Sequence, residues 1–314
     1  MRKNELTTHR RKLRTCKGKH SQLARRHIRR QNIGMSTPKI SVGLLGLGII
    51  GSRVAERLRE AGHQVFVWSR SARDVENFKT TPRAVAESSR IIQIFVRDDS
   101  ALLSALRDMQ PALTSNHVVM NHSTVSKSAT LEAAAICASA QSAFLDAPFT
   151  GSKMAAQNGK LVYYIGGSSE TLERVRPILE LSSQKILPLG GIGEAMVLKI
   201  VTNLVSSITV KALAEAAAIT RSQGISLDLL KAALEANANH STLIGMKLPT
   251  IINGDFEPHF SLQNMLKDAD FARSLARQAD IKTPALDCTA DAMRAGVDLG
   301  MGDLDFSVIG RISG

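Results

Sequence analysis

A lysine and an asparagine stand four residues apart in the largely apolar segment GGIGEAMVLKIVTN. On a helix this spacing places Lys199 and Asn203 on the same face. A lysine ammonium can give a proton to a carbonyl oxygen as negative charge develops there, and the neutral amine can accept a proton from a hydroxyl group. Burial among the apolar neighbours is expected to lower the pKa of Lys199, which makes the neutral amine accessible. An exposed lysine and a surface amide on an amphipathic helix are the alternative interpretation.

A glycine-rich turn, GLGIIG, follows a predicted strand and opens a predicted helix. In this context Gly46 permits the tight turn, Gly48 lets backbone amides approach a pyrophosphate, and Gly51 lets the helix pack closely on the strand. The N-terminus of that helix attracts phosphate. A simple glycine-rich turn is the alternative. We expect a dinucleotide to bind here, on Gly46, Leu47, Gly48, Ile49, Ile50 and Gly51.

The residues after the second predicted strand indicate which nicotinamide cofactor is used. NAD-binding proteins place an acidic residue about 20 residues beyond the glycines to hold the ribose hydroxyls, whereas this chain has VWSRSAR there. Ser69, Arg70, Ser71 and Arg73 supply hydroxyl and guanidinium groups, which suit a 2′-phosphate. NADP(H) is therefore the predicted cofactor, with NAD(H) as the second choice. Arginines that merely solvate a loop are the alternative.

The elements that would position these groups follow from the periodicity of the chain. Between residues 39 and 189, short β-rich runs alternate with helical patterns, which is typical of a parallel sheet covered by helices. The runs are ISVGLL, QVFVWS, IIQIFV, HVVMNH, AFLDA, LVYYIG and KILPL. Past Gly193 only helical patterns remain, over residues 194–223, 226–236, 262–279 and 284–295.

The predicted fold is α/β, a Rossmann-type doubly wound sheet followed by an all-helical C-terminal domain and preceded by a disordered basic arm. The predicted boundaries are 1–36 for the arm, 37–193 for the NADP-binding sheet domain, and 194–314 for a helical domain that serves substrate binding and dimerisation. A chain of 314 residues with 44% hydrophobic residues can bury a sizeable core and favours two domains.

The net charge of +12 comes almost wholly from the N-terminus, because residues 1–34 hold twelve Lys and Arg against the single Glu5. This acid-poor arm almost lacks apolar periodicity, which predicts a disordered or only weakly helical segment. It is a targeting peptide, a nucleic-acid-binding arm, or a segment that precedes the true translation start at Met35, and the last is favoured. The protein is accordingly expected in the cytoplasm, or in an organelle if the arm is a transit peptide.

Composition also bears on metals and membranes. The three cysteines, Cys16, Cys137 and Cys288, are scattered and lack metal-ligand spacing. The sequence therefore predicts neither a metal site nor a disulfide framework. Charged and amide side chains interrupt the longest apolar stretch, which argues against a membrane span.

Four motifs in a fixed order carry a resemblance to a known family. They are GLGIIG, NHSTVS, DAPFTGSKMAAQNGKL and the glycine-led KIVTN, with FSLQNMLKDADFA in the tail. From residue 39 to the C-terminus the chain resembles the β-hydroxyacid dehydrogenase family, which includes 3-hydroxyisobutyrate dehydrogenase, tartronate semialdehyde reductase, and the glyoxylate and succinic semialdehyde reductases. The resemblance implies an NAD(P)-dependent oxidoreductase acting on a small carboxylic acid. It also implies a homodimer or homotetramer. The interrupted apolar stretch predicts no membrane partner, and the pairing of Lys199 with Asn203 makes nucleic acid a less favoured partner than a small carboxylic acid.

The resemblance further implies roles for individual residues. Lys199 corresponds to the catalytic lysine and Asn203 to the amide that orients the substrate. The hydroxyls and backbone amides of a substrate loop can hold a carboxylate, and that loop corresponds to Thr150, Gly151 and Ser152. The residues placed near the cofactor are Ser123, Thr124, Phe260, Lys267 and Asp268. Without the resemblance, Phe260 would be assigned to the core and Lys267–Asp268 to a solvated pair.

Three positions depart from the family pattern. Ala195 stands where the family often has a glycine, four residues before the lysine, and is expected to narrow the approach to the site. Phe149 and Thr150 replace the valine and serine of many relatives. The GSKMAAQNG stretch is closer to the glyoxylate and succinic semialdehyde reductases than to the hydroxyisobutyrate enzymes.

Other function classes fit less well. Imine reductases share the architecture but usually lack this lysine, and a phosphosugar dehydrogenase would need a phosphate-binding cluster that the helical half does not offer. The alternative from a different class is a nucleotide-sensing or nucleic-acid-associated binding protein anchored by the basic arm. The pairing of Lys199 with Asn203 favours catalysis.

Overall fold

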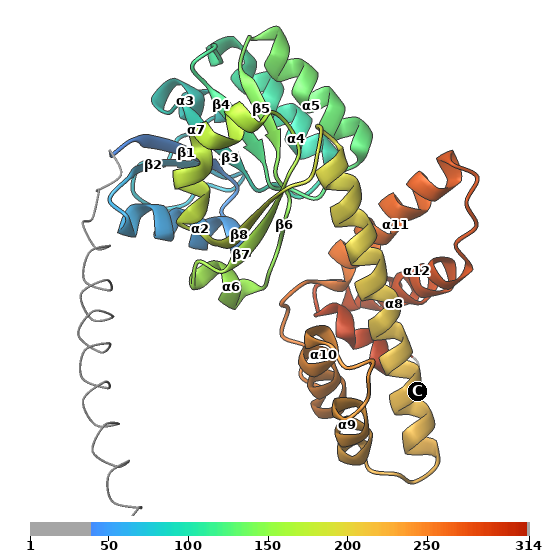
Figure 1. Cartoon of the computed structure of the whole chain (residues 1–314). Coiled ribbons are helices and arrows are strands. Elements are labelled where there is room, and N and C mark those ends of the chain that lie inside the picture. The colour runs from blue at the N-terminus through green and yellow to red at the C-terminus, as the bar shows by residue number, and fades with distance from the viewer. Residues whose placement is uncertain (1–38, 313–314) are drawn as a thin grey trace, which may run out of the picture. The chain divides into compact units, whose positions relative to one another are not determined.

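The computed structural model describes residues 39–312 (Figure 1), so the basic arm predicted over residues 1–36 lies outside the described residues. Five parallel strands form the main sheet, in the order β2-β1-β3-β4-β5. Their bounds are β1 Ser41–Leu45, β2 Gln64–Trp68, β3 Ile91–Ile94, β4 Val118–Asn121 and β5 Ala143–Asp146. In this order β1 and β3 flank the point where strand addition changes direction. The carboxyl ends of such strands are the usual place for a ligand.

Helices cover both faces of this sheet (Figure 1). One face is covered by α2 Ile49–Glu60 and α7 Ser169–Glu180, and the other by α3 Pro82–Ser88, α4 Asp99–Met109 and α5 Lys127–Ser139, with the short helix η1 Gln110–Ala112 after α4. The strands carry Val, Ile and Leu side chains that are buried on both sides of the sheet, as a parallel sheet between two helical layers requires. The predicted Rossmann-type doubly wound sheet is confirmed.

The last three strands form a second, smaller sheet in the order β6-β7-β8. β6 Phe149–Thr150 runs antiparallel to β7 Leu161–Ile165, and β7 runs parallel to β8 Ser183–Pro188. The expectation of one parallel sheet through residue 189 was therefore wrong. Between β6 and β7 the chain holds only the short helix α6 Lys153–Gln157. So short a connection returns the chain antiparallel, because a parallel crossover needs about a dozen residues or more.

The chain after Gly193 is helical, as the pattern predicts. Its long helices are α8 Glu194–Ser222, α9 Leu227–Glu235, α10 Thr242–Asn253, α11 Leu262–Gln278 and α12 Pro284–Gly296, and two short helical segments follow, η2 Val297–Met301 and η3 Phe306–Arg311. The helix α10 was not predicted, because Gly245 and Pro249 within it are poor helix formers. Burial of Ile244, Leu248 and Ile251 stabilises it nonetheless.

The helix α8 runs through the helical domain and packs on α10, α11, α12 and η3 (Figure 1). Its length and its mean hydropathy, 1.5 in the most apolar window, would allow it to cross a membrane. Its buried residues include Lys199 and Asn203, which form hydrogen bonds with other protein groups. Only 33% of that window is buried, which leaves an apolar face uncovered.

Candidate active site

Lys199 lies in the second turn of α8 and is almost fully buried, with 9% of its surface exposed. Its Nζ donates a hydrogen bond to Oδ1 of Asn203 at 3.0 Å, so the two residues share one helix face as predicted. The Asn203 amide nitrogen donates in turn to Oδ2 of Asp268 on α11 at 2.6 Å. Burial excludes the interpretation as an exposed lysine, and the three side chains form a continuous chain of hydrogen bonds.

Burial also controls the protonation of Lys199. Desolvation lowers the pKa of Lys199 to about 8; the charge of Asp268 opposes this shift and the charge of Lys267 adds to it. The direction is the one that the apolar helix face predicts. A pKa near 8 makes both ammonium and amine accessible close to neutral pH, which suits a group that gives and takes a proton.

Lys267 and Asp268 connect α11 to the sheet domain. Their side chains form an ion pair, with 3.0 Å between Nζ and Oδ1, and Asp268 is fully buried. Lys267 also donates a hydrogen bond to the backbone oxygen of Thr124, in the loop between β4 and α5. Next to Thr124, the Oγ of Ser123 accepts the N–H of Val96 at 2.8 Å, where β3 and β4 end. The pair is thus held against the strand ends rather than solvated.

A carboxylate that the motifs left without a role anchors α8. Asp146, the last residue of β5, accepts the N–H groups of Gly193 and Met196 at 3.0 and 2.9 Å. It therefore caps the helix that carries Lys199. Burial raises the pKa of Asp146 to about 7, against the effect of those two hydrogen bonds. The only signal for this role in the sequence is a single acid in the apolar run AFLDA.

The glycine turn between β1 and α2 has the geometry that a dinucleotide requires. Gly46 adopts φ +100°, and a Cβ on it would lie 1.9 Å from the carbonyl oxygen of Phe95. A Cβ on Gly51 would lie 2.0 Å from the oxygen of Gly46, so only glycine permits this approach of helix and strand. Gly48 is exposed, begins α2 without a side-chain cap, and would have nothing within 4 Å of its Cβ. The N-terminus of α2 is open to a phosphate group, so these residues fit the cofactor.

The residues predicted to bind a 2′-phosphate lie beside the glycine turn, because the N–H of Gly46 donates to the oxygen of Trp68 at 2.8 Å. The Oγ of Ser69 donates to the backbone oxygen of Ser71 at 2.6 Å. Arg70 and Ser71 are exposed. Their segment therefore follows directly on the residue that is bonded to the glycine turn, and a contact of these side chains with a 2′-phosphate stays a prediction.

The predicted substrate loop is the turn from β6 into α6. Thr150 ends β6, and Gly151 adopts φ +139°, a conformation that favours glycine. Ser152 caps α6 by accepting the N–H of Ala155 on its Oγ at 3.3 Å. Thr150 and Ser152 are half-buried and Gly151 is exposed. The loop can thus offer hydroxyl and amide groups to a ligand.

The structure shows how two further residues from the sequence analysis, Phe260 and Ala195, are packed. Phe260, just before α11, is half-buried and packs edge-on against Phe306, with ring centroids 6.4 Å apart. Its contact with the cofactor stays a prediction. Ala195 is fully buried, and its Cβ would lie 3.4 Å from a Cβ built on Gly166. It fills space between α8 and the end of β7, and the expectation that it narrows the approach to the site stays a prediction.

His122, next to Ser123, is a buried side chain that sequence analysis did not single out. Its ring stacks on Phe95 with 4.6 Å between centroids and lies 4.9 Å from the ring of Tyr163. Its Nδ1 lies 2.7 Å from the backbone oxygen of Ala147. Burial lowers the pKa of His122 to about 4 despite this contact, so the ring is neutral near pH 7 and leaves Lys199 as the better proton donor.

The structure brings the predicted residues into two groups. One joins Lys199, Asn203, Asp268, Lys267 and Thr124 through hydrogen bonds and an ion pair. The other comprises the glycine turn and residues 69–71. In the glycine turn Leu47 and Ile50 pack on the core, and Ile49 is 45% exposed. Within residues 39–312 no hydrogen bond joins the two groups, and no three His, Cys, Asp or Glu side chains are arranged to hold a metal ion.

Two family models match consecutive parts of the chain. Residues 41–191 match the NAD binding domain of 6-phosphogluconate dehydrogenase, and residues 193–312 match the model for NAD-binding of NADP-dependent 3-hydroxyisobutyrate dehydrogenase. The chain belongs to the β-hydroxyacid dehydrogenase family. As a member of the β-hydroxyacid dehydrogenases it is an NAD(P)-dependent dehydrogenase that acts on a hydroxyl group.

Relatives of this β-hydroxyacid dehydrogenase include enzymes and a nuclear factor. It is 25% identical over 280 residues to glyoxylate/succinic semialdehyde reductase 1 of Arabidopsis thaliana. That alignment covers 86% of this chain and 97% of the reductase. It is 25% identical over 280 residues to the cytokine-like nuclear factor N-PAC of Homo sapiens, covering 86% of this chain but 51% of that protein. Its fold matches 3-hydroxyisobutyrate dehydrogenase of Mycobacterium tuberculosis with L-serine, with TM-score 0.79, 24% identity, and coverage of 87% of this chain and 98% of that one.

Proposed function

We propose that this dehydrogenase moves a hydride between NADPH and the carbonyl carbon of a small semialdehyde, or the matching carbon of a 3-hydroxy acid, with Lys199 as general acid and base. The observation that carries the proposal is a buried series of two hydrogen bonds. Lys199 Nζ donates to Asn203 Oδ1 at 3.0 Å, and the Asn203 amide nitrogen donates to Asp268 Oδ2 at 2.6 Å. An ammonium so held can protonate an oxygen in one defined place.

The cofactor, when bound on the glycine turn, supplies the hydride for reduction or accepts it in oxidation. During reduction, negative charge develops on the carbonyl oxygen, and Lys199 donates a proton to it from Nζ. Asn203 holds Nζ through its Oδ1, and Asp268 holds the Asn203 amide in the orientation that leaves Oδ1 facing the lysine. In oxidation the neutral amine of Lys199 takes the hydroxyl proton, so the same atoms serve both directions.

The polar loop at residues 150–152 and the relatives support the proposed substrate class. Backbone amides and the Thr150 and Ser152 hydroxyls suit a carboxylate. The Arabidopsis thaliana relative is named a glyoxylate/succinic semialdehyde reductase, which supports small aldehyde acids as substrates. The test is a panel of glyoxylate, succinic semialdehyde and 3-hydroxyisobutyrate, followed by nicotinamide absorbance. We expect turnover of at least one aldehyde acid, and turnover of none of the three would refute the proposal.

NADPH is the proposed cofactor because Ser69, Arg70 and Ser71 directly follow Trp68, whose backbone oxygen accepts the N–H of Gly46 in the glycine turn, and because the helical half matches a family model named for an NADP-dependent enzyme. Arg70→Asp should lower the ratio of kcat/KM for NADPH over NADH by about tenfold or more, since it replaces a charge-assisted contact with repulsion. Arg90→Asp, at an exposed arginine just before β3, is the matched control. An unchanged ratio in Arg70→Asp would show that this side chain does not contact the phosphate.

The activity should depend on pH through Lys199, whose pKa is lowered to about 8. Reduction needs the ammonium, so kcat/KM for the aldehyde should be constant below pH 8 and fall about tenfold per unit above it. Oxidation needs the neutral amine, so its kcat/KM should rise through the same range and level off at higher pH. Profiles of both directions, measured at saturating cofactor, check this. A reduction rate that stays flat to pH 10 would contradict the role of Lys199.

We also propose that the chain forms a homodimer or homotetramer through α8. Large apolar side chains are exposed along this helix, at Leu198 (42%), Val201 (43%), Val205 (58%) and Ile219 (65%). The first three recur at helical spacing on one side of the helix, and a continuous exposed apolar surface favours burial against a partner. The molar mass in solution measures this directly.

No observation on residues 39–312 favours the alternative of a binding protein anchored by the basic arm. The relative named as a nuclear factor and the reductase each match 86% of this chain at 25% identity, so this similarity does not distinguish the two classes. The buried Lys199–Asn203 pair is a feature that a binding module does not need.

A further inference from the structure

Lys153 places a positive charge directly after the predicted substrate loop. It is the first residue of α6 and follows Ser152, which caps that helix. Its Nζ lies 3.3 Å from Oε1 of Glu257, in the loop between α10 and α11. The ion pair therefore joins the segment after the predicted substrate loop, in the sheet domain, to the loop before α11, in the helical domain.

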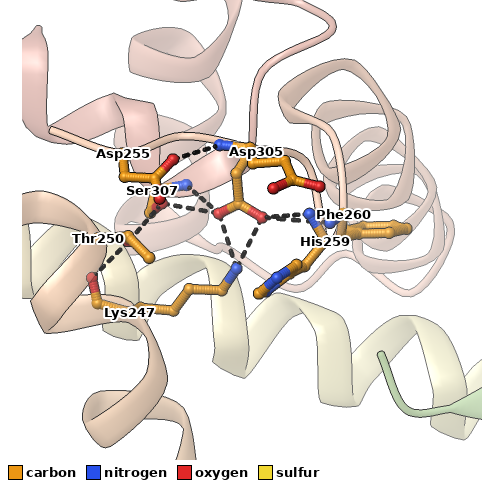
Figure 2. A network of polar contacts seen from close by, with 8 residues as sticks. Lys247, Thr250, Asp255, His259, Phe260, Asp305 and Ser307 are labelled. Carbon is orange, nitrogen blue, oxygen red and sulfur yellow. Dashed lines mark hydrogen bonds and ion pairs between the residues drawn. The ribbon is translucent and has the colours of Figure 1, made fainter. Parts of the chain in front are cut away.

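The loop that carries Glu257 is held by a buried network (Figure 2). The Asp305 carboxylate accepts two hydrogen bonds from Lys247 at 2.7 and 2.8 Å, and its Oδ2 also accepts the N–H groups of His259 and Phe260 at 3.1 and 3.2 Å. On the other side of the loop, Asp255 Oδ1 accepts the N–H of Glu257 at 3.2 Å. These hydrogen bonds hold the backbone on both sides of Glu257, whose side chain extends to Lys153.

The contact between Lys153 and Glu257 is itself weak. Their side chains are 35% and 68% exposed, and an ion pair this open to water contributes less than about 1 kcal/mol. Another carboxylate can replace that of Glu257 at little cost. The ammonium of Lys153 is therefore available to another anionic ligand.

We propose that Lys153 is a specificity-determining residue that binds the carboxylate of substrates in which two or more carbons separate the carboxylate from the carbonyl group. This inference rests on the proposed function. In glyoxylate the carboxylate is bonded to the carbonyl carbon, so it stays within the short reach of the Thr150 and Ser152 groups. In succinic semialdehyde two methylene groups carry it farther from the reacting carbon. The flexible four-carbon stem of Lys153 can meet it there in place of Glu257.

The experiment compares glyoxylate and succinic semialdehyde as substrates of the full chain and its variants. Lys153→Met should raise KM for succinic semialdehyde about tenfold, the loss of about 1.4 kcal/mol of binding, with kcat nearly unchanged. KM for glyoxylate should stay within about twofold, because its carboxylate does not reach Lys153. Lys153→Arg should keep most of the affinity for the longer acid, and Glu257→Gln should lower its KM by freeing the ammonium.

Lys160→Met, at an exposed lysine shortly after α6, is the matched control and should leave both KM values unchanged. An equal change of both KM values in Lys153→Met, no change of either, or turnover of glyoxylate alone by the unmodified chain would overturn the inference and leave the proposed function standing. Turnover of neither aldehyde nor 3-hydroxyisobutyrate would refute the proposed function itself.

Discussion

Lys199→Ala should lower kcat for aldehyde reduction by a factor of about 10²–10⁴, the contribution of a positioned general acid, while NADPH still binds. The proton donor is lost, but the glycine turn between β1 and α2 keeps its geometry because it forms no hydrogen bond with Lys199. Stopped-flow or steady-state absorbance gives kcat, and quenching or enhancement of nicotinamide fluorescence gives the dissociation constant of NADPH.

A second variant separates the lost proton from lost packing. Lys199→Met keeps an apolar side chain of similar length and removes the ammonium with its hydrogen bond to Asn203, so it should show the same loss of kcat. Because burial disfavours the ammonium, neither variant should lose folding free energy through the missing charge.

The matched control for Lys199 is on the same helix. Lys211 forms an ion pair with Glu215, with 3.1 Å between Nζ and Oε1, and Lys211→Ala should leave kcat almost unchanged. A kcat for Lys199→Ala within about a factor of ten of the unmodified chain would remove this residue from the proton transfer.

Lys247→Met should lower the free energy of unfolding by about 3 kcal/mol or more, because it leaves the Asp305 carboxylate buried without its counter-charge. The side chains of Lys247 and Asp305 are 4% and 1% exposed. Lys247 also lies over the ring of Phe306, 4.5 Å from its centroid. Burial by itself raises the pKa of Asp305, but the charge of Lys247 and the hydrogen bonds from Lys247 and Ser307 outweigh it and hold that pKa below its usual value.

Urea denaturation measures this loss of unfolding free energy. Two further variants test whether the loss comes from the buried, unpaired charge. Lys247→Met combined with Asp305→Asn removes both charges and should recover part of the stability. Arg83→Ala breaks an exposed ion pair with Glu87, whose side chains are 54% and 53% exposed, and should cost less than about 1 kcal/mol. A loss in Lys247→Met no larger than that in Arg83→Ala would show that the buried pair does not stabilise the helical domain.

The pH dependence of this variant has a definite sign. Because the folded-state pKa of Asp305 is lowered, the pair contributes stability above the unfolded pKa of an aspartate, about 4, and loses it as pH falls through the folded value. The difference in unfolding free energy between the unmodified chain and Lys247→Met should therefore shrink in acid.

Much of the sheet domain and the cofactor turn could be predicted from the chain alone, because the signals are local. Alternating β-rich runs and helical patterns gave the order of the five parallel strands along the chain and the helices around them. The glycines of GLGIIG have conformational tasks that follow from their place between one strand and one helix. Lys199 and Asn203 are four residues apart, so helical geometry alone brings them together.

Contacts between distant segments could not be predicted, since packing decides them. Asp146 reaches α8 across 47 and 50 residues of sequence, Asn203 meets Asp268 across 65, and Lys153 meets Glu257 across 104. No periodicity records such pairs. The antiparallel strand β6 and the helix α10, with its internal proline, depend in the same way on the surfaces against which they fold.

The amino-acid sequence by itself determined the family, the doubly wound sheet, the dinucleotide turn and the pairing of Lys199 with Asn203. Only the tertiary structure decided that Lys199 is buried with a lowered pKa, that Asp146 and Asp268 hold its helix and its partner, and that Glu257 stands opposite Lys153. The physical reason is that dihedral preferences and hydrophobic periodicity act over a few residues, whereas desolvation and charge pairing depend on which segments pack together.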